Sequence, residues 1–178
     1  MKYQDNQGSL DTAKKILKVN HAGEFGAINI YRSQILVSKL FRRSYVPLLE
    51  NFLADETRHL NIFWVEIQRR DSIKCKSYWL CGLGGWLMGL LSAFFGQTGV
   101  MACTWAVESV VANHLHNQLR YLHQKKDQEA YDAVKSILED EENHRDIGQN
   151  LGGKNILYAP FRFMIRVFTE AVIRIGMR

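Results

Sequence analysis

The chain has 178 residues, of which 47% are apolar, 23% are charged and only two are proline. This is the composition of one globular domain with a full hydrophobic core, and it excludes disordered, collagen-like and disulfide-scaffold proteins. The 23 Lys and Arg outnumber the 18 Asp and Glu, and the net charge of +5 favours acidic partners without choosing between nucleic acid and anionic lipid. Three cysteines without a CxxC pair indicate a reduced compartment and no zinc ribbon.

Helix start and stop signals follow one another along the chain, and we find no alternating strand pattern. They predict five helices: one capped by Asp11 and running to about residue 40, one opened by Pro47 and running to about residue 70, one over about 100–124, one capped by Asp127 and ending near Gly148, and one opened by Pro160. The fold class is therefore predicted to be all-α.

One segment, residues 77–107, contains no Asp, Glu, Lys or Arg. It is long enough to cross a bilayer, but six glycines break it up and Gln97 and Thr98 interrupt its apolar character. We expect a glycine-bent apolar hairpin, buried in a partner or dipped into a membrane face, with the membrane-associating part at about 77–100. Gly85 and Gly89, four residues apart, would allow close contact with another helix.

The C-terminal stretch, about residues 160–176, places a charged residue at every fourth position of an otherwise apolar sequence. The charged positions are 162, 166, 170, 174 and 178. This pattern is typical of an amphipathic helix lying on anionic lipid, although a helix packed on the core with a solvated stripe gives the same pattern. The N-terminus lacks the apolar stretch of a secretory signal and is a poor transit peptide, so we expect a cytosolic protein or one on a membrane facing the cytosol.

Two Glu-x-x-His motifs carry the chemistry that the sequence suggests. Glu56 with His59 and Glu141 with His144 each place both side chains on one helix face. A further glutamate precedes each motif at nearly the same distance, since Glu24 lies 32 residues before Glu56 and Glu108 lies 33 before Glu141. The repeat predicts a duplicated helical hairpin.

Apolar residues at helical spacing surround all four glutamates, so the carboxylates should converge in the core of a four-helix bundle. Buried unpaired charges are costly, and two divalent cations would balance a charge of −4. One Glu from each of two helices, plus Glu-x-x-His from each of the other two, is the ligand pattern of ferritin-like di-iron and di-manganese bundles. Carboxylate and imidazole ligands suit iron or manganese.

The other histidines have different interpretations. His21 is predicted to be structural or to orient a ligand, and His114 is a candidate for orienting a ligand. His114 and His116 point to opposite sides of a helix, which argues against a separate zinc site. No nucleotide-binding glycine motif or nucleophile elbow is present, and the basic pairs near helix ends favour the helix dipole over nucleic-acid binding.

Four motifs in order resemble the demethoxyubiquinone hydroxylases, di-iron monooxygenases of ubiquinone biosynthesis. They are HAGEFGA at 21–27, DETRHL at 55–60, ACTWAVE at 102–108 and EENHRDIG at 141–148. The resemblance runs from about residue 16 to the C-terminus. Two positions depart from the family pattern, since Ser109 stands where a second Glu is common and Leu115 where a Tyr is common.

The resemblance implies a single ferritin-like domain over 1–178, attached peripherally to the cytoplasmic side of the inner membrane that holds the quinone. The implied iron ligands are Glu24, Glu56, His59, Glu108, Glu141 and His144. Two irons per chain, O₂ and an external reductant, either NADH or a redox partner, would hydroxylate a polyprenyl demethoxy-benzoquinone or quinol ring. Partner proteins of ubiquinone biosynthesis and a homo-oligomer are compatible with it, and nucleic acid is not expected as a partner.

Three alternative functions remain open at this level. A ferritin-like di-iron hydroxylase acting on tRNA would share the ligand pattern, and the net charge of +5 permits it. A non-catalytic iron-binding bundle would share the ligands but store or buffer the metal. A membrane-bound interaction module without metal is a third interpretation, in which substitutions at the six residues would be silent.

Overall fold

The structure is a computed structural model that describes residues 2–41 and 43–177, with side chains described from residue 11 onward; the predicted stripe position Arg178 lies outside this range. All regular elements in the described residues are helical, which confirms the predicted all-α class. The main helices are α1 (Lys2–Leu40), α2 (Val46–Arg69), α3 (Tyr78–Phe94), α4 (Gly96–Lys125), α5 (Gln128–Gly148) and α6 (Ala159–Gly176). A π-helical turn (Gln149–Gly153) and a 3₁₀ turn (Ile156–Tyr158) connect α5 to α6.

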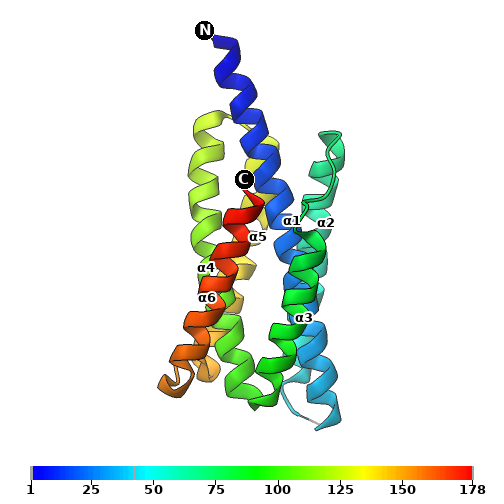
Figure 1. The fold of residues 1–178 in the computed structure, drawn as a ribbon, viewed down its shortest axis with the longest axis vertical. Coiled ribbons are helices and arrows are strands. Elements are labelled where there is room, and N and C mark those ends of the chain that lie inside the picture. The colour runs from blue at the N-terminus through cyan, green and yellow to red at the C-terminus, as the bar shows by residue number, and fades with distance from the viewer. Residues whose placement is uncertain (1, 42, 178) are drawn as a thin grey trace.

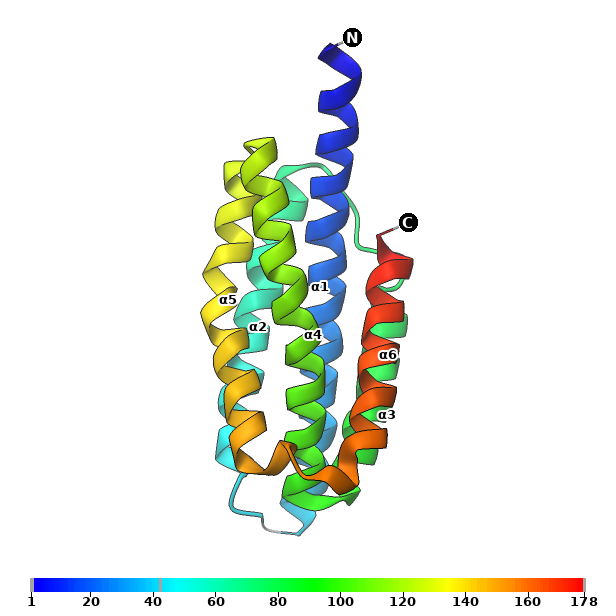
Figure 2. The same cartoon turned by 90° about the vertical axis from the view of Figure 1, so that its left-hand side faces the viewer.

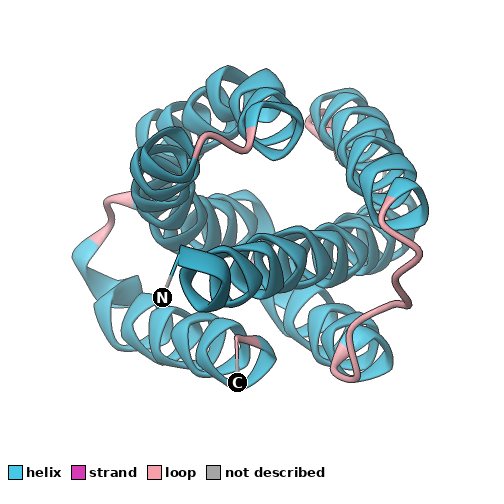
Figure 3. Cartoon of the chain, turned by 90° about the horizontal axis from the view of Figure 1, so that it is seen from above, coloured by secondary structure: helices cyan, strands magenta, loops and turns pink. Residues whose placement is uncertain are grey.

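Two helical hairpins, α1–α2 and α4–α5, form the four-helix bundle (Figures 1 and 3). The other two helices lie outside it on the same flank: α3 packs along α1, and α6 packs on α4 and α1 (Figure 2). The duplicated hairpin expected from the sequence is therefore present, and α3 separates its two copies along the chain.

Most helix ends follow the expected chemistry. The Asp127 side chain accepts a hydrogen bond from the Ala130 N–H at 3.2 Å and caps α5. Pro47 and Pro160 stand in the first turns of α2 and α6, where a missing N–H costs no helical hydrogen bond. Asp11 is not a cap, because α1 already begins at Lys2 and Asp11 lies inside it.

The uncharged segment bends once, at a turn where Gly96 has φ +69°, and α4 begins there rather than near residue 100. The expectation that its other glycines break the helix is wrong, since four of them lie inside α3 and Gly99 lies inside α4. A methyl group added at Gly85 would lie 2.2 Å from the Gly26 carbonyl oxygen, and one at Gly89 would lie 2.3 Å from the Ile30 oxygen. These glycines therefore let α3 approach the α1 backbone. No described helix has both the length and the apolar character needed to cross a membrane.

The core of the bundle is divided into two apolar clusters along its length. One includes Leu17 and Phe63, and the other includes Tyr31 and Leu49. On each of the four bundle helices, a buried glutamate falls between the residues contributed to the two clusters. A layer of buried carboxylates thus separates the two clusters in the middle of the bundle.

Candidate metal centre

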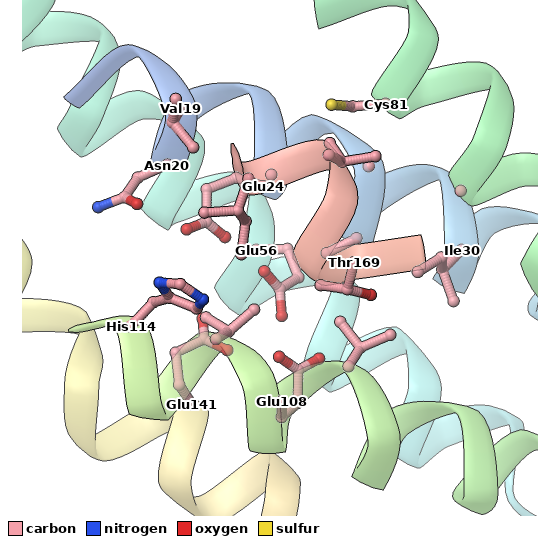
Figure 4. A pocket seen from close by; sticks show the side chains of 18 of the residues that line it. Val19, Asn20, Glu24, Ile30, Glu56, Cys81, Glu108, His114, Glu141 and Thr169 are labelled. Carbon is pink, nitrogen blue, oxygen red and sulfur yellow. The ribbon is translucent and has the colours of Figure 1, made fainter. Parts of the chain in front are cut away.

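The layer between the apolar clusters contains the six residues singled out by the sequence, and each is at most 5% exposed. They are Glu24 on α1, Glu56 and His59 on α2, Glu108 on α4, and Glu141 and His144 on α5. Figure 4 shows the four glutamate side chains turned toward one another from four helices. The helical offset of three residues presents each Glu and its His to the same interior space.

The six side chains form two overlapping groups that could each hold a metal ion. The first group is Glu24, Glu56, His59 and Glu141, and the second is Glu56, Glu108, Glu141 and His144. Within each group the ligand atoms lie within 4.8 Å of one another. Glu56 and Glu141 belong to both groups, so the arrangement would allow two neighbouring ions to be held with these two carboxylates in common.

Several buried polar atoms in the cluster lack a hydrogen-bond partner. Both carboxylate oxygens of Glu56 and the Nδ1 atoms of His59 and His144 are among them. His59 Nδ1 approaches Glu141 Oε1 to 2.8 Å, and His144 Nδ1 approaches Glu56 Oε1 to 3.2 Å, but neither contact has hydrogen-bond geometry. Unsatisfied buried polar atoms are costly. Close, converging lone pairs of this kind fit a pair of cations.

The electrostatics of the cluster favour the binding of protons or cations. Burial raises the pKa of Glu24 and of Glu108 well above the usual carboxyl range, and the neighbouring carboxylates of Glu141 and Glu56 raise it further. Burial by itself would lower the pKa of His59, but the contacts with Glu141 and Glu56 raise it to about 10. Without metal the cluster therefore retains protons, and cations that bind there would displace them.

Two aspartates hold the imidazole rings of the cluster. The Nε2–H of His59 donates to Asp140 Oδ2 at 3.1 Å, and the Nε2–H of His144 donates to Asp55 Oδ2 at 3.2 Å. Each aspartate immediately precedes the glutamate of one motif and bonds to the histidine of the other motif. These two hydrogen bonds therefore link the two hairpins. This pairing leaves both Nδ1 atoms turned toward the carboxylates, as in metal sites where a carboxylate fixes the ligating imidazole.

A cavity of about 90 Å³ reaches the cluster between α1, α3, α4 and α6. Four glutamates lie at its inner end (Glu24, Glu56, Glu108 and Glu141), and most of its remaining wall is apolar, with Ala27, Met88, Val107 and Val172 among the contributors. A flat apolar group could therefore lie directly beside the carboxylate layer.

Residues 11–176 match the family model described as ubiquinone biosynthesis protein COQ7. The chain belongs to this family. Curated COQ7-family relatives include the mitochondrial NADPH-dependent 3-demethoxyubiquinone 3-hydroxylases of Dictyostelium discoideum and Mus musculus, which are 33% and 34% identical to this chain. The alignments cover 93% and 80% of this chain and 76% and 65% of those relatives.

A bacterial COQ7-family relative, the 3-demethoxyubiquinol 3-hydroxylase of Rhodospirillum rubrum, is 33% identical over 79% of this chain and 65% of its own length. The chain thus spans about two thirds of the mouse and bacterial relatives and about three quarters of the Dictyostelium one. These relatives are named as hydroxylases, and the family is one of hydroxylating oxidoreductases.

The position and the partner of His114 could not be predicted from the spacing of the motifs. It lies on the wall of the cavity, and its Nε2 atom pairs with Glu170 Oε1 of α6 at 3.1 Å (Figure 4). Its recorded polar partner is thus a residue of α6 rather than one of the six. Of the two positions that depart from the family pattern, Leu115 is buried and lines the cavity, and Ser109 donates to the Trp105 carbonyl.

Sequence reasoning did not assign a role to Asp55, Asp140 or Tyr31. The hydroxyl of Tyr31 on α1 donates a hydrogen bond to Glu108 Oε1 on α4 at 3.1 Å and so orients that carboxylate. The two aspartates could have been found from the sequence, because both motifs are Asp-Glu-x-x-His. The sequence gives no indication of a role for Tyr31, since it stands at an apolar position of its helix. Its hydrogen bond to Glu108 depends on the packing of α1 against α4.

Proposed function

We propose that this chain is a di-iron monooxygenase that hydroxylates the ring of a polyprenyl demethoxy-benzoquinol in ubiquinone biosynthesis. The observation that carries the proposal is the doubled ligand group, with two shared carboxylates, at the inner end of an apolar cavity. The names of the COQ7-family relatives supply the substrate class.

In this proposal Glu24 and His59 would hold one iron, Glu108 and His144 would hold the other, and Glu56 and Glu141 would be shared. When bound, the iron pair supplies the redox chemistry that activates O₂. The overall reaction consumes one quinol, O₂, NADPH and H⁺ and gives the hydroxylated quinol, H₂O and NADP⁺. NADPH is the reductant named for the eukaryotic relatives.

The protein's own residues orient the ligands and exclude water. Asp140 and Asp55 fix the two imidazoles, and the Tyr31 hydroxyl holds Glu108. The apolar wall of the cavity keeps bulk water from the reacting ring and strengthens the electrostatic interactions inside. His114 lies on the cavity wall and is paired with Glu170, so its ring can bond to a quinol oxygen and position the quinol.

The outer surfaces of α3 and α6 support a membrane surface as a partner. Trp79 and Leu83 on α3, and Phe163 and Phe168 on α6, are exposed apolar side chains. The same two helices line the cavity, and the Phe168 ring packs beside Gly84 of α3. A polyprenyl tail could therefore remain in lipid while its ring enters the cavity. We propose that the protein lies peripherally on the cytoplasmic side of the inner membrane.

The proposed function can be tested with purified, iron-loaded protein and a short-chain demethoxy-quinol, with the product identified by mass spectrometry. Wild type should produce the hydroxylated quinol, and Glu56→Ala should produce none. Glu139→Gln changes an exposed glutamate of the same helical hairpin as Glu141 and should retain full activity. Hydroxylation by Glu56→Ala at the wild-type rate, or no product from iron-loaded wild type, would contradict the proposal.

A further inference from the structure

Two arginines of α6 lie against one indole ring of α4, where the two helices pack together (Figure 2). The guanidinium carbon of Arg162 is 4.9 Å from the centroid of the Trp105 ring, and that of Arg166 is 5.2 Å from it. The two arginines are four residues apart, so they project from the same face of α6. Two positive charges therefore share one aromatic ring.

The first of these arginines is held in a fixed position. Arg162 is only 9% exposed, and its Nη1 atom donates to the carbonyl oxygens of Gly153 and Asn155, both at 2.7 Å. Its other terminal nitrogen, Nη2, forms no hydrogen bond with any described residue. Burial and the charge of Arg166 lower the pKa of Arg162, so its surroundings disfavour the positive charge. An anion beside Nη2 would compensate that charge.

The second arginine has no partner of opposite charge in the described part of the chain. Arg166 forms no hydrogen bond or ion pair there, and its Nε atom is buried without an acceptor. The acidic residue of α6, Glu170, instead contacts His114 at 3.1 Å and Arg174 at 3.6 Å. A buried donor without an acceptor is costly, so we expect an acceptor from another molecule beside Arg166.

The sequence around the two arginines supplies no carboxylate. Residues 147–169 contain Lys154, Arg162 and Arg166 but no Asp or Glu, and residues 96–107 of α4 contain no charged residue. A guanidinium group binds phosphate through two parallel hydrogen bonds, because its planar fork of N–H groups matches two phosphate oxygens. A phosphate group is therefore the anion that fits two adjacent arginines.

The location of the arginine pair indicates where such a phosphate comes from. Phe163 and Val167 follow the two arginines in the sequence, and they are 70% and 52% exposed. Arg162 and Arg166 therefore border the apolar outer surface of α6. When an amphipathic helix buries its apolar face in a membrane, the cations along the border of that face lie at the level of the lipid headgroups.

We propose that Arg162 and Arg166 form a binding site for the phosphate of an anionic lipid headgroup. Trp105 holds both guanidinium groups in place, and the phosphate accepts hydrogen bonds from Nη2 of Arg162 and from the guanidinium of Arg166. The inference rests on the membrane contact of α6 in the proposed function, but not on the hydroxylation. Because α6 also lines the cavity, a fixed headgroup would hold the cavity in one orientation relative to the bilayer.

The test is sedimentation of the iron-loaded full chain with phosphatidylcholine vesicles, prepared with and without phosphatidylglycerol. Wild type should prefer the vesicles that contain phosphatidylglycerol. Arg166→Lys keeps the charge but loses the planar fork, and it should weaken binding to these vesicles by at least about tenfold. Arg174→Lys is the matched control, because its side chain is 77% exposed on the same helix, and it should change binding less than about twofold. Equal effects of the two variants, or no preference of wild type for phosphatidylglycerol, would overturn the proposal.

Titration with inorganic phosphate and with glycerophosphoglycerol, the soluble headgroup of phosphatidylglycerol, distinguishes a lipid from a free phosphate. Binding of inorganic phosphate that depends on Arg166, without binding to the vesicles, would support the anion site and show that the lipid source is wrong. The vesicle assay needs neither quinol nor turnover. Its failure would therefore leave the proposed hydroxylation standing, and a failure of the hydroxylation assay would leave the phosphate site standing.

Discussion

The carboxylate of Asp140 on α5 accepts a hydrogen bond from His59 of α2 at 3.1 Å, and Asp55 of α2 makes the reciprocal bond to His144 of α5 at 3.2 Å. Each Asp-Glu-x-x-His motif thus contributes ligands to the cluster and also orients the imidazole of the other motif. Neither hairpin can form a complete half-site without the other, so assembly of the centre depends on the packing of α2 against α5.

Asp140→Asn should weaken metal binding while the helical fold is retained. An amide is a poorer acceptor for the His59 N–H, and loss of such partners lowers metal affinity by about 10–100-fold. The measurement is an anaerobic titration with ferrous iron. Asp132→Asn, an exposed change on the same helix, is the control and should bind like wild type. An unchanged affinity in Asp140→Asn would show that this hydrogen bond does not orient the ligand.

Glu24→Gln should stabilise the metal-free protein and lose much of the stabilisation by iron. Burial and neighbouring carboxylates raise the pKa of Glu24, so its ionised form is disfavoured and a neutral amide relieves the repulsion. A gain of about 1 kcal/mol corresponds to a midpoint increase of about 2–4 °C in a protein of this size. Thermal unfolding at pH 8, with chelator and with ferrous iron, gives both values. A lower midpoint in chelator would contradict the expected relief of repulsion.

Gly85→Ala should destabilise the packing of α3 on α1. The added methyl group would lie 2.2 Å from the Gly26 carbonyl oxygen, so the helices must separate, at a cost of about 1–3 kcal/mol. Gly23→Ala is the matched control, because nothing lies within 4 Å of its added methyl and alanine is the better helix former by about 1 kcal/mol. Denaturant unfolding should therefore shift in opposite directions for the two variants, and a shift in the same direction would argue against close α1–α3 packing.

The contribution of His21 to the free energy of unfolding should decrease as the pH falls from about 6.5 to 4. Burial and the nearby charge of Lys74 lower the pKa of His21 from 6.5 to about 4. In this interval the unfolded state binds a proton at this residue that the folded state does not, so the free energy of unfolding decreases with decreasing pH. His21→Gln removes this contribution. Comparison of urea unfolding at pH 7 and pH 5 should therefore show a smaller loss for the variant, and equal losses would place the titration elsewhere.

Phe163→Ser should weaken binding to anionic lipid vesicles if the outer surface of α6 meets the membrane. Phe163 is 70% exposed, so the substitution should leave the fold unchanged. Burying a phenylalanine side chain contributes about 1.5–3 kcal/mol, which corresponds to a loss of about 10–100-fold in partitioning. Vesicle sedimentation measures the loss, and Val65→Ser on α2 is the control at another exposed apolar position. Equal partitioning of Phe163→Ser and wild type would show that the outer surface of α6 does not bind the membrane.

The helical class, the duplicated hairpin and the set of residues that meet in the middle of the bundle could all be predicted from the sequence. The physical reason is that an offset of three residues fixes two side chains on one helix face, and a repeated spacing of 32 and 33 residues fixes them at the same level of two hairpins. The close contact at Gly85 and Gly89 was predictable for the same reason, because both positions share one face of α3.

The contacts between side chains of different helices could not be predicted in this way. The bonds from Asp140 to His59, from Tyr31 to Glu108 and from His114 to Glu170 each join separate helices. The contacts of the His21 ring with Trp64 and Tyr78 likewise need α1, α2 and the start of α3 in place. Periodicity along one helix specifies a face but not the register or rotation of the neighbouring helix, so these long-range partners follow from packing alone.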